Sequence, residues 1–142
     1  MSLVVHVPHA STDIPEDTYR EFLISPAEVR REAEISADLY TDLLAKSAWP
    51  SATIVQAEVS RLIVDVERYE SDELEEMAEV GRGVLYTHDH QGRQMRHPPS
   101  SERRKSLLDR YYHPHWRKLR EAAAGAVLID LHSYPTAPWP VE

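Results

Sequence analysis

Two short apolar runs, one near each end of the chain, constrain the fold more than any other feature of the sequence. The first covers residues 3–7 and is rich in valine, and the second covers residues 126–131. Continuous apolar runs of this length, bounded by turn residues, are typical of strands buried in a sheet. His9 follows the first run and His132 ends the second. If the two strands are parallel, both histidines lie at the sheet edge where ligands of α/β proteins bind.

Two long helices are predicted between these strands. One begins at Ser25, where Pro26 and Glu28 complete the signature of a capped helix start, and should run to about residue 46. The other begins near residue 100 and should run to about residue 124, with a kink or break at Pro114. Gly125 then ends it.

The middle of the chain predicts further strands and a long irregular segment. Residues 52–58 and 62–66 are rich in β-branched and apolar residues, so two more strands are expected there. Residues 70–80 are acidic, and residues 81–100 hold glycines and histidines without periodicity, as in a long loop. This order of elements predicts a layered α/β domain.

Length, charge and cysteine content limit the class of protein. The 142 residues suit one domain spanning residues 1–142. The net charge of −8 makes nucleic acid an unfavourable partner, and a solvated helix face explains the basic residues at 96–110 as well as a binding patch does. No apolar run is long enough to span a membrane, and the start lacks the pattern of a signal peptide. The absence of cysteine suits the cytoplasm, where we expect the protein, and excludes thiolate ligands.

The two histidines predict a metal site. A hydrolytic zinc site needs about three protein ligands and an open position for water, and histidine and carboxylates are suitable ligands. Asp130 and His132 alternate with apolar residues, so they share one face of the last strand. The Asp130 carboxylate could therefore orient an imidazole that binds the metal. The alternative is that each histidine only completes the end of a strand.

A second group of charged residues lies around the expected strand at residues 62–66. Arg61, Asp65 and Arg68 flank or interrupt this apolar segment. An arginine at a strand end can bind a carboxylate or phosphate through its planar guanidinium group. The alternative is an internal ion pair between arginine and Asp65, and the sequence favours neither.

Four motifs along the chain together resemble the N-formylglutamate amidohydrolase family, which is related to the zinc carboxypeptidases and aspartoacylases. The resemblance covers nearly the whole chain, and its most specific parts are the arginine segment and the terminal Asp-x-His-Ser motif. The motifs are Val-Pro-His-Ala-Ser at 7–11 with Ile-Pro at 14–15, Ser-Arg-Leu-Ile-Val-Asp-Val-Glu-Arg at 60–68, Tyr-Tyr-His-Pro-His at 111–115, and Ile-Asp-Leu-His-Ser at 129–133.

The resemblance implies a three-layer α/β/α sandwich of the zinc-carboxypeptidase kind, with a mixed sheet and in shortened form. It also implies a divalent metal, with zinc expected, bound by His9, His132 and an acidic residue. We expect Glu34 in the first long helix to be that residue, with Asp13 as the rival. Such an enzyme would cleave the amide of a small N-acylated amino acid such as N-formylglutamate.

The resemblance further implies residues that bind a small substrate bearing a carboxylate. Arg61, Arg68 and Ser133 would contact this substrate, while Asp65 and Asp130 would support the metal ligands. Glu67 stands where the family has an asparagine. The sequence leaves open whether the chain forms a homo-oligomer.

The chain departs from the family in length. Relatives are roughly twice as long, and the part without a counterpart here would supply later strands and the glutamate that serves as general base. A metal–water mechanism is incomplete without a general base. A catalytically inactive relative that binds a metal or small ligand is therefore the alternative function, and the acyl group of the substrate stays undefined.

Overall fold

The computed structural model describes residues 1–141, and a three-stranded parallel sheet lies at its centre. The strands are β1 (Leu3–Val7), β2 (Thr53–Gln56) and β3 (Val127–Asp130), in the order β2-β1-β3. β1 pairs in parallel with both neighbours, and His6 lies opposite Asp130 of β3. The expected strands at both ends of the chain are therefore confirmed. The family resemblance implied a mixed sheet, whereas all three of these strands run parallel.

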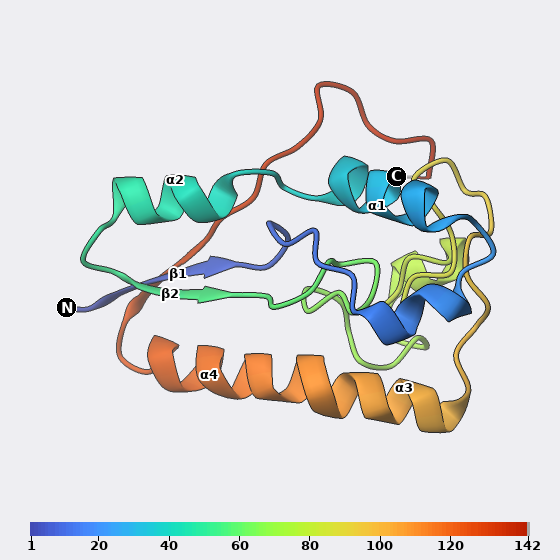
Figure 1. Ribbon diagram of the computed structural model, residues 1–142. Helices are drawn as coiled ribbons and strands as arrows, with labels where there is room; N and C mark the ends of the chain where they lie inside the picture. Colours follow the sequence, from blue (N-terminus) through green and yellow to red (C-terminus); the bar gives the residue numbers. More distant parts are fainter. Residues whose placement is uncertain (142) are drawn as a thin grey trace.

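Helices cover both faces of this sheet. On one face, Ala45 of α2 (Thr41–Ala48) packs in a cluster with Val5 and Val7 of β1. On the other face, Leu119 of α4 (His113–Ala123) packs against Val4 of β1. Figure 1 shows α1 and α2 along one side of the sheet, and α3 and α4 as a long rod along the other. The expected α/β class with three layers is confirmed.

The first predicted helix is in fact two helices. α1 (Pro26–Ser36) begins as predicted, because Ser25 and Glu28 exchange the two hydrogen bonds of a capping box. It ends ten residues earlier than expected, because Ala37 is extended and the N–H of Asp38 donates to the carbonyl of His9 instead of continuing the helix. α2 starts after Tyr40, which has a left-handed backbone with φ of 68°. The break places Asp38 in a loop beside the end of β1.

The second predicted helix changes its type along its length. It consists of α3 (Ser101–Leu107), a π-helical turn at Leu108–Tyr112, and α4 (His113–Ala123). Pro114 lies in the first turn of α4, where the absence of its N–H is tolerated. The irregularity expected at this proline therefore occurs as the π turn just before it. Gly125 follows α4 with φ of 70°, a conformation that glycine adopts readily.

The strand predicted at residues 62–66 is wrong. These residues form turns, in which the N–H groups of Ile63 and Val64 donate to the carbonyl of Ser60. Leu62, Ile63 and Val64 are nonetheless buried in the largest hydrophobic cluster. A short apolar run indicates burial, and it does not by itself distinguish a strand from a buried turn.

The remaining segments are short helices and irregular chain. Two 3₁₀ helices cover Glu16–Glu21 and Glu76–Val80, and residues 81–100 form the expected irregular excursion. Within residues 1–141, no helix is long and apolar enough to cross a membrane.

Candidate metal centre

His9 and His132 lie together at one edge of the sheet. β1 and β3 are parallel neighbours, so the residues that follow them emerge side by side. The two imidazole rings have their centroids 5.3 Å apart. Between them lies the carboxylate of Asp38, whose Oδ2 is 3.6 Å from His9 Nδ1 and 3.1 Å from His132 Nδ1. Two strand ends and the loop after α1 therefore bring three potential ligand atoms to one point.

The other nitrogen of each ring contacts a different carboxylate. His9 Nε2 is 2.8 Å from Asp65 Oδ1, and His132 Nε2 is 3.2 Å from Asp130 Oδ2. These contacts fix how each ring is turned and direct both Nδ1 atoms toward Asp38. Carboxylates that hold the outer nitrogen of an imidazole in this way are typical of histidines that bind metals.

The local charges strongly perturb the titration of this cluster. Hydrogen bonds to Asp130 and Asp38 raise the pKa of His132 to about 10. Burial alone would raise the pKa of Asp38, but its hydrogen bonds with His132 and His9 lower that pKa to about 2. The cluster therefore attracts positive charge, supplied by a proton on His132 or by a cation.

The donor set fits a divalent transition metal. Ligand atoms of His9, Asp38 and His132 all lie within 4.8 Å of one another. Two imidazole nitrogens and one carboxylate oxygen form a set that is typical of catalytic zinc, which keeps a further position open. His9 is 5% exposed, which also limits competition by bulk water at its ring.

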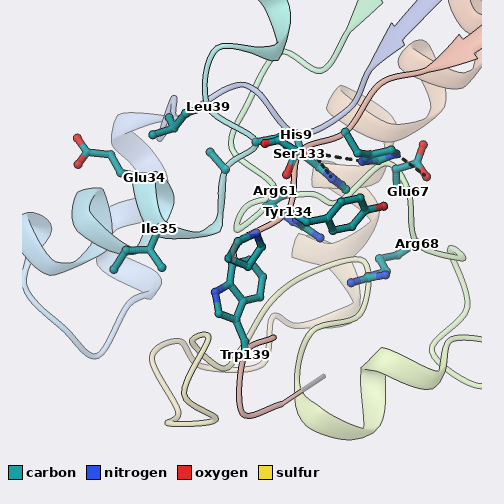
Figure 2. A pocket seen from close by; sticks show the side chains of 14 residues that line it. His9, Glu34, Ile35, Leu39, Arg61, Glu67, Arg68, Ser133, Tyr134 and Trp139 are labelled. Carbon is teal, nitrogen blue, oxygen red and sulfur yellow. Dashed lines mark hydrogen bonds and ion pairs between the residues drawn. The ribbon is translucent and has the colours of Figure 1, made fainter. Parts of the chain in front are cut away.

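Neither acidic residue predicted as the third ligand belongs to this group. Glu34 is exposed on α1, and its carboxylate points away from His9 at the rim of the cavity (Figure 2). Asp13 is also exposed, in the loop after β1. The prediction placed Glu34 on a helix that continued through Asp38. Because α1 ends at Ser36, the chain turns and brings Asp38 to the histidines instead.

Asp65 is the centre of a buried network behind His9. It is fully buried, and its Oδ2 accepts hydrogen bonds from the Tyr86 hydroxyl (2.6 Å) and from Arg61 Nη2 (3.1 Å). Burial alone would raise the pKa of Asp65, but the charges of His9 and Arg61 lower it well below its usual value. The supporting position predicted for Asp65 agrees with this geometry.

Arg61 belongs to the same internal network. Besides Asp65, its guanidinium donates to the hydroxyl of Tyr86 and to the carbonyl of Ser36. Its charge is thus neutralised inside the protein, which favours the internal ion pair over the direct substrate contact implied by the family resemblance. Arg61 also lines the cavity, where it can influence the site through its ion pair with Asp65, which in turn contacts His9.

An open cavity of about 470 Å³ adjoins the three ligand candidates. Arg68 lines this cavity together with His132, and Figure 2 shows its side chain pointing into the open space. Its Nε donates to the carbonyl of Arg82 at 3.2 Å, which holds the side chain in place. Ser133 lines the same cavity and is exposed. Arg68 and Ser133 are thus placed where a substrate could reach them.

Sequence reasoning missed several residues of this site. The sequence predicts one helix through Asp38, whereas α1 ends at Ser36 and the extended backbone at Ala37 gives Asp38 its position. His6 lies in the first predicted strand and His115 in the second predicted long helix, and neither is among the predicted site residues. The structure joins them, with His6 Nε2 2.8 Å from His115 Nε2. The available signal was the polar His6 within an otherwise apolar strand.

Comparisons with known proteins agree with the resemblance drawn from the motifs. The sequence model of the family described as N-formylglutamate amidohydrolase matches residues 1–142. A solved N-formylglutamate amidohydrolase from Ralstonia eutropha JMP134 is similar in fold, with a TM-score of 0.78 and 21% sequence identity. The match covers 95% of this chain and 54% of that one, so this chain spans about half the length of its structural relative. No curated protein matches the sequence significantly.

Proposed function

Because this chain belongs to the N-formylglutamate amidohydrolase family, we propose that it is a metal-dependent hydrolase acting on a small N-acylated amino acid such as N-formylglutamate. One observation carries the proposal. The Nδ1 atoms of His9 and His132 converge on the Asp38 carboxylate, while their Nε2 atoms are held by other carboxylates. This arrangement suits a bound divalent cation at the border of an open cavity.

His9, Asp38 and His132 would hold the ion, which we expect to be zinc. A zinc ion bound there supplies activation of water and polarisation of an amide carbonyl. Asp65 and Asp130 keep the two imidazoles oriented with Nδ1 toward the ion. The ligands are therefore fixed before the ion binds, which lowers the cost of assembling the site.

Arg68 would bind the carboxylate of the substrate. It lines the cavity beside His132, and its anchored Nε leaves the outer end of the guanidinium directed into the open space. A guanidinium can bind a carboxylate through two parallel hydrogen bonds, which would hold the amide in a fixed position relative to the ion. Ser133 also lines the cavity and offers its hydroxyl group there as a further hydrogen-bonding group.

The alternative function is binding of a metal or a small carboxylate without hydrolysis of an amide. The match covers 54% of the structural relative, so the activity of that whole protein comes to this chain only as a proposal.

Two measurements test these functions. The metal content of protein purified without a histidine tag should reach one zinc ion per chain after zinc addition and removal of the excess. Incubation with N-formylglutamate should then release formate. Zinc binding without release of formate from a panel of N-acyl amino acids would favour the inactive relative. Absence of zinc binding would contradict both readings of the site as a metal centre.

The matched variants are Asp38→Asn and Glu34→Gln. Each removes one carboxylate charge near the cavity, but only Asp38 lies between the two histidines. Asp38→Asn should lose zinc binding and formate release together, and Glu34→Gln should retain both.

A further inference from the structure

We infer that His6, a buried side chain in the central strand, is a positioning residue that holds Asp130 against His132 and thereby sets the metal affinity of the site. The inference rests on the proposed metal centre. It concerns a histidine that lies outside the three ligand candidates and is 2% exposed.

Asp130 bridges the two histidines. Its Oδ1 is 2.9 Å from His6 Nδ1, and its Oδ2 is 3.2 Å from His132 Nε2. The register of the parallel strands explains this contact, because His6 of β1 lies opposite Asp130 of β3. Each carboxylate oxygen therefore contacts a different imidazole, so a rotation of the carboxylate would break both contacts.

His6 is the fixed end of this arrangement. Asp130 is 44% exposed at an edge strand, so solvent would compete for its oxygens if nothing anchored it. The His6 ring is held at both nitrogens, since its Nε2 lies 2.8 Å from Nε2 of His115 in α4. Burial and the neighbouring His6 charge lower the pKa of His115 to about 4, so a neutral His115 can accept a hydrogen bond from His6. A buried pair of histidines thus links α4 to the ligand His132.

A second cation site is the competing explanation for this cluster. Ligand atoms of His6, Glu67 and Asp130 lie within 4.8 Å of one another. However, His6 Nδ1 is already at hydrogen-bond distance from Asp130 (2.9 Å) and near Glu67 Oε1 (3.2 Å). A proton on His6 therefore satisfies these carboxylates without an ion.

The charge balance also favours hydrogen bonding over a second ion. Four carboxylates surround the centre, and two guanidinium groups, one divalent ion and the protonated ring of His6 already offset their charge. A second divalent ion would leave an uncompensated positive charge in a largely buried region. The carboxylates are those of Asp38, Asp65, Glu67 and Asp130, and the guanidinium groups are those of Arg61 and Arg68.

The test compares two variants of His6 in the full chain. His6→Asn keeps an N–H donor close to the position of Nδ1, and His6→Leu removes the donor at similar volume. Both lose the contact with His115, so both should lower the free energy of unfolding. His113→Leu is the matched control, because this partly exposed histidine of α4 contacts Asp109 and Glu70 and does not line the cavity.

The readout is the zinc dissociation constant, measured by competition with a chromophoric chelator. Loss of a carboxylate that holds a metal-binding imidazole typically weakens metal affinity by about 10- to 100-fold, and His6→Leu removes the anchor of that carboxylate. We expect a loss of that size for His6→Leu, retention within about threefold for His6→Asn, and no change for His113→Leu. Equal affinity in His6→Leu and the unchanged protein would overturn the inference.

Ion stoichiometry and a measurement on the unchanged protein complete the test. One zinc ion per chain supports the inference, whereas two ions, falling to one in His6→Leu, would establish a second cation site instead. If the unchanged chain binds no zinc at all, the proposed function fails first, and the inference falls with it.

Should His6→Leu not fold, nitrogen-15 NMR of the histidine rings decides the question. The proton on His6 Nδ1 should persist when zinc saturates the protein, and its replacement by zinc would refute the positioning role.

Discussion

Substituting Asp65 with asparagine tests the buried network that supports the site. Asp65 is 0% exposed and accepts hydrogen bonds from Arg61, from the hydroxyl of Tyr86 and from the N–H of Glu67. An asparagine of the same shape carries no charge. Its NH₂ group cannot accept the hydrogen bonds that the carboxylate accepts, so some of these buried donors would lose their acceptor. The buried guanidinium of Arg61 would then lie without its ion-pair partner.

The expected loss of stability is large. Removing one partner of a buried ion pair costs about 3–5 kcal/mol, because the remaining charge is buried without compensation. A domain of this size has a total free energy of unfolding of about 5–15 kcal/mol, so Asp65→Asn should remove a substantial part of it. With a urea slope of about 1–3 kcal/mol per molar, the unfolding midpoint should fall by at least about 1 M.

Tryptophan fluorescence during urea unfolding is a suitable assay. Trp116 Nε1 donates to the carbonyl of Val66, directly after Asp65 in the sequence, so its emission should report on this region. Asp109→Asn is the control, since Asp109 makes only the solvent-exposed contacts of α3 and α4. If Asp65→Asn shifts the midpoint no more than the control does, the buried network of Asp65 does not contribute to the stability of the fold.

Three further predictions concern binding and pH. Arg68→Ala should lower kcat/KM for N-formylglutamate about 10- to 100-fold, the equivalent of about 1.5–3 kcal/mol for a hydrogen bond to a charged group, with zinc content unchanged; unchanged turnover would exclude Arg68 as the carboxylate-binding residue. Asp38→Asn should weaken zinc binding by more than 100-fold in a chelator competition, and equal affinity in Asp38→Asn and Glu34→Gln would remove Asp38 from the ligand set. The low pKa of His115, about 4, means that the unfolded state binds more protons than the folded state between pH 6.5 and pH 4. The free energy of unfolding should therefore fall with decreasing pH in that window, by at most about 3 kcal/mol, and His115→Gln should flatten the dependence measured by urea titrations at several pH values.

The strands that position the site could be predicted because their signals are local. The valine-rich start and the apolar run before His132 match β1 and β3 closely, and their parallel pairing brings the two histidines together. The start of α1 could also be predicted from the sequence, because Ser25 and Glu28 form hydrogen bonds with neighbouring backbone groups. Such features depend on few residues and little on the rest of the fold.

The errors concern residues whose roles depend on distant contacts. The sequence favours Glu34 as the third ligand, because helical periodicity does not show that the N–H of Asp38 donates to the carbonyl of His9. The segment at residues 62–66 has the composition of a strand, but Ser60 binds its backbone and turns it into the core. Whether Arg61 would be internal or exposed depended on Tyr86, 25 residues away, which no local pattern reveals.

The strand order β2-β1-β3 also determines when the site can exist during synthesis. β1 leaves the ribosome first, yet its second neighbour in the sheet comes from the far end of the chain, with His6 and Asp130 separated by 124 positions. Contacts between such distant segments form late, because the entropy of closing a large loop is lost before the contacts contribute favourable free energy. A nascent chain that has reached α4 therefore presents one edge of its central strand without a partner, open to strand pairing with other chains. Synthesis of β3 pairs that edge of the central strand and delivers His132 in the same step, so completion of the pairing of β1 and completion of the ligand set coincide.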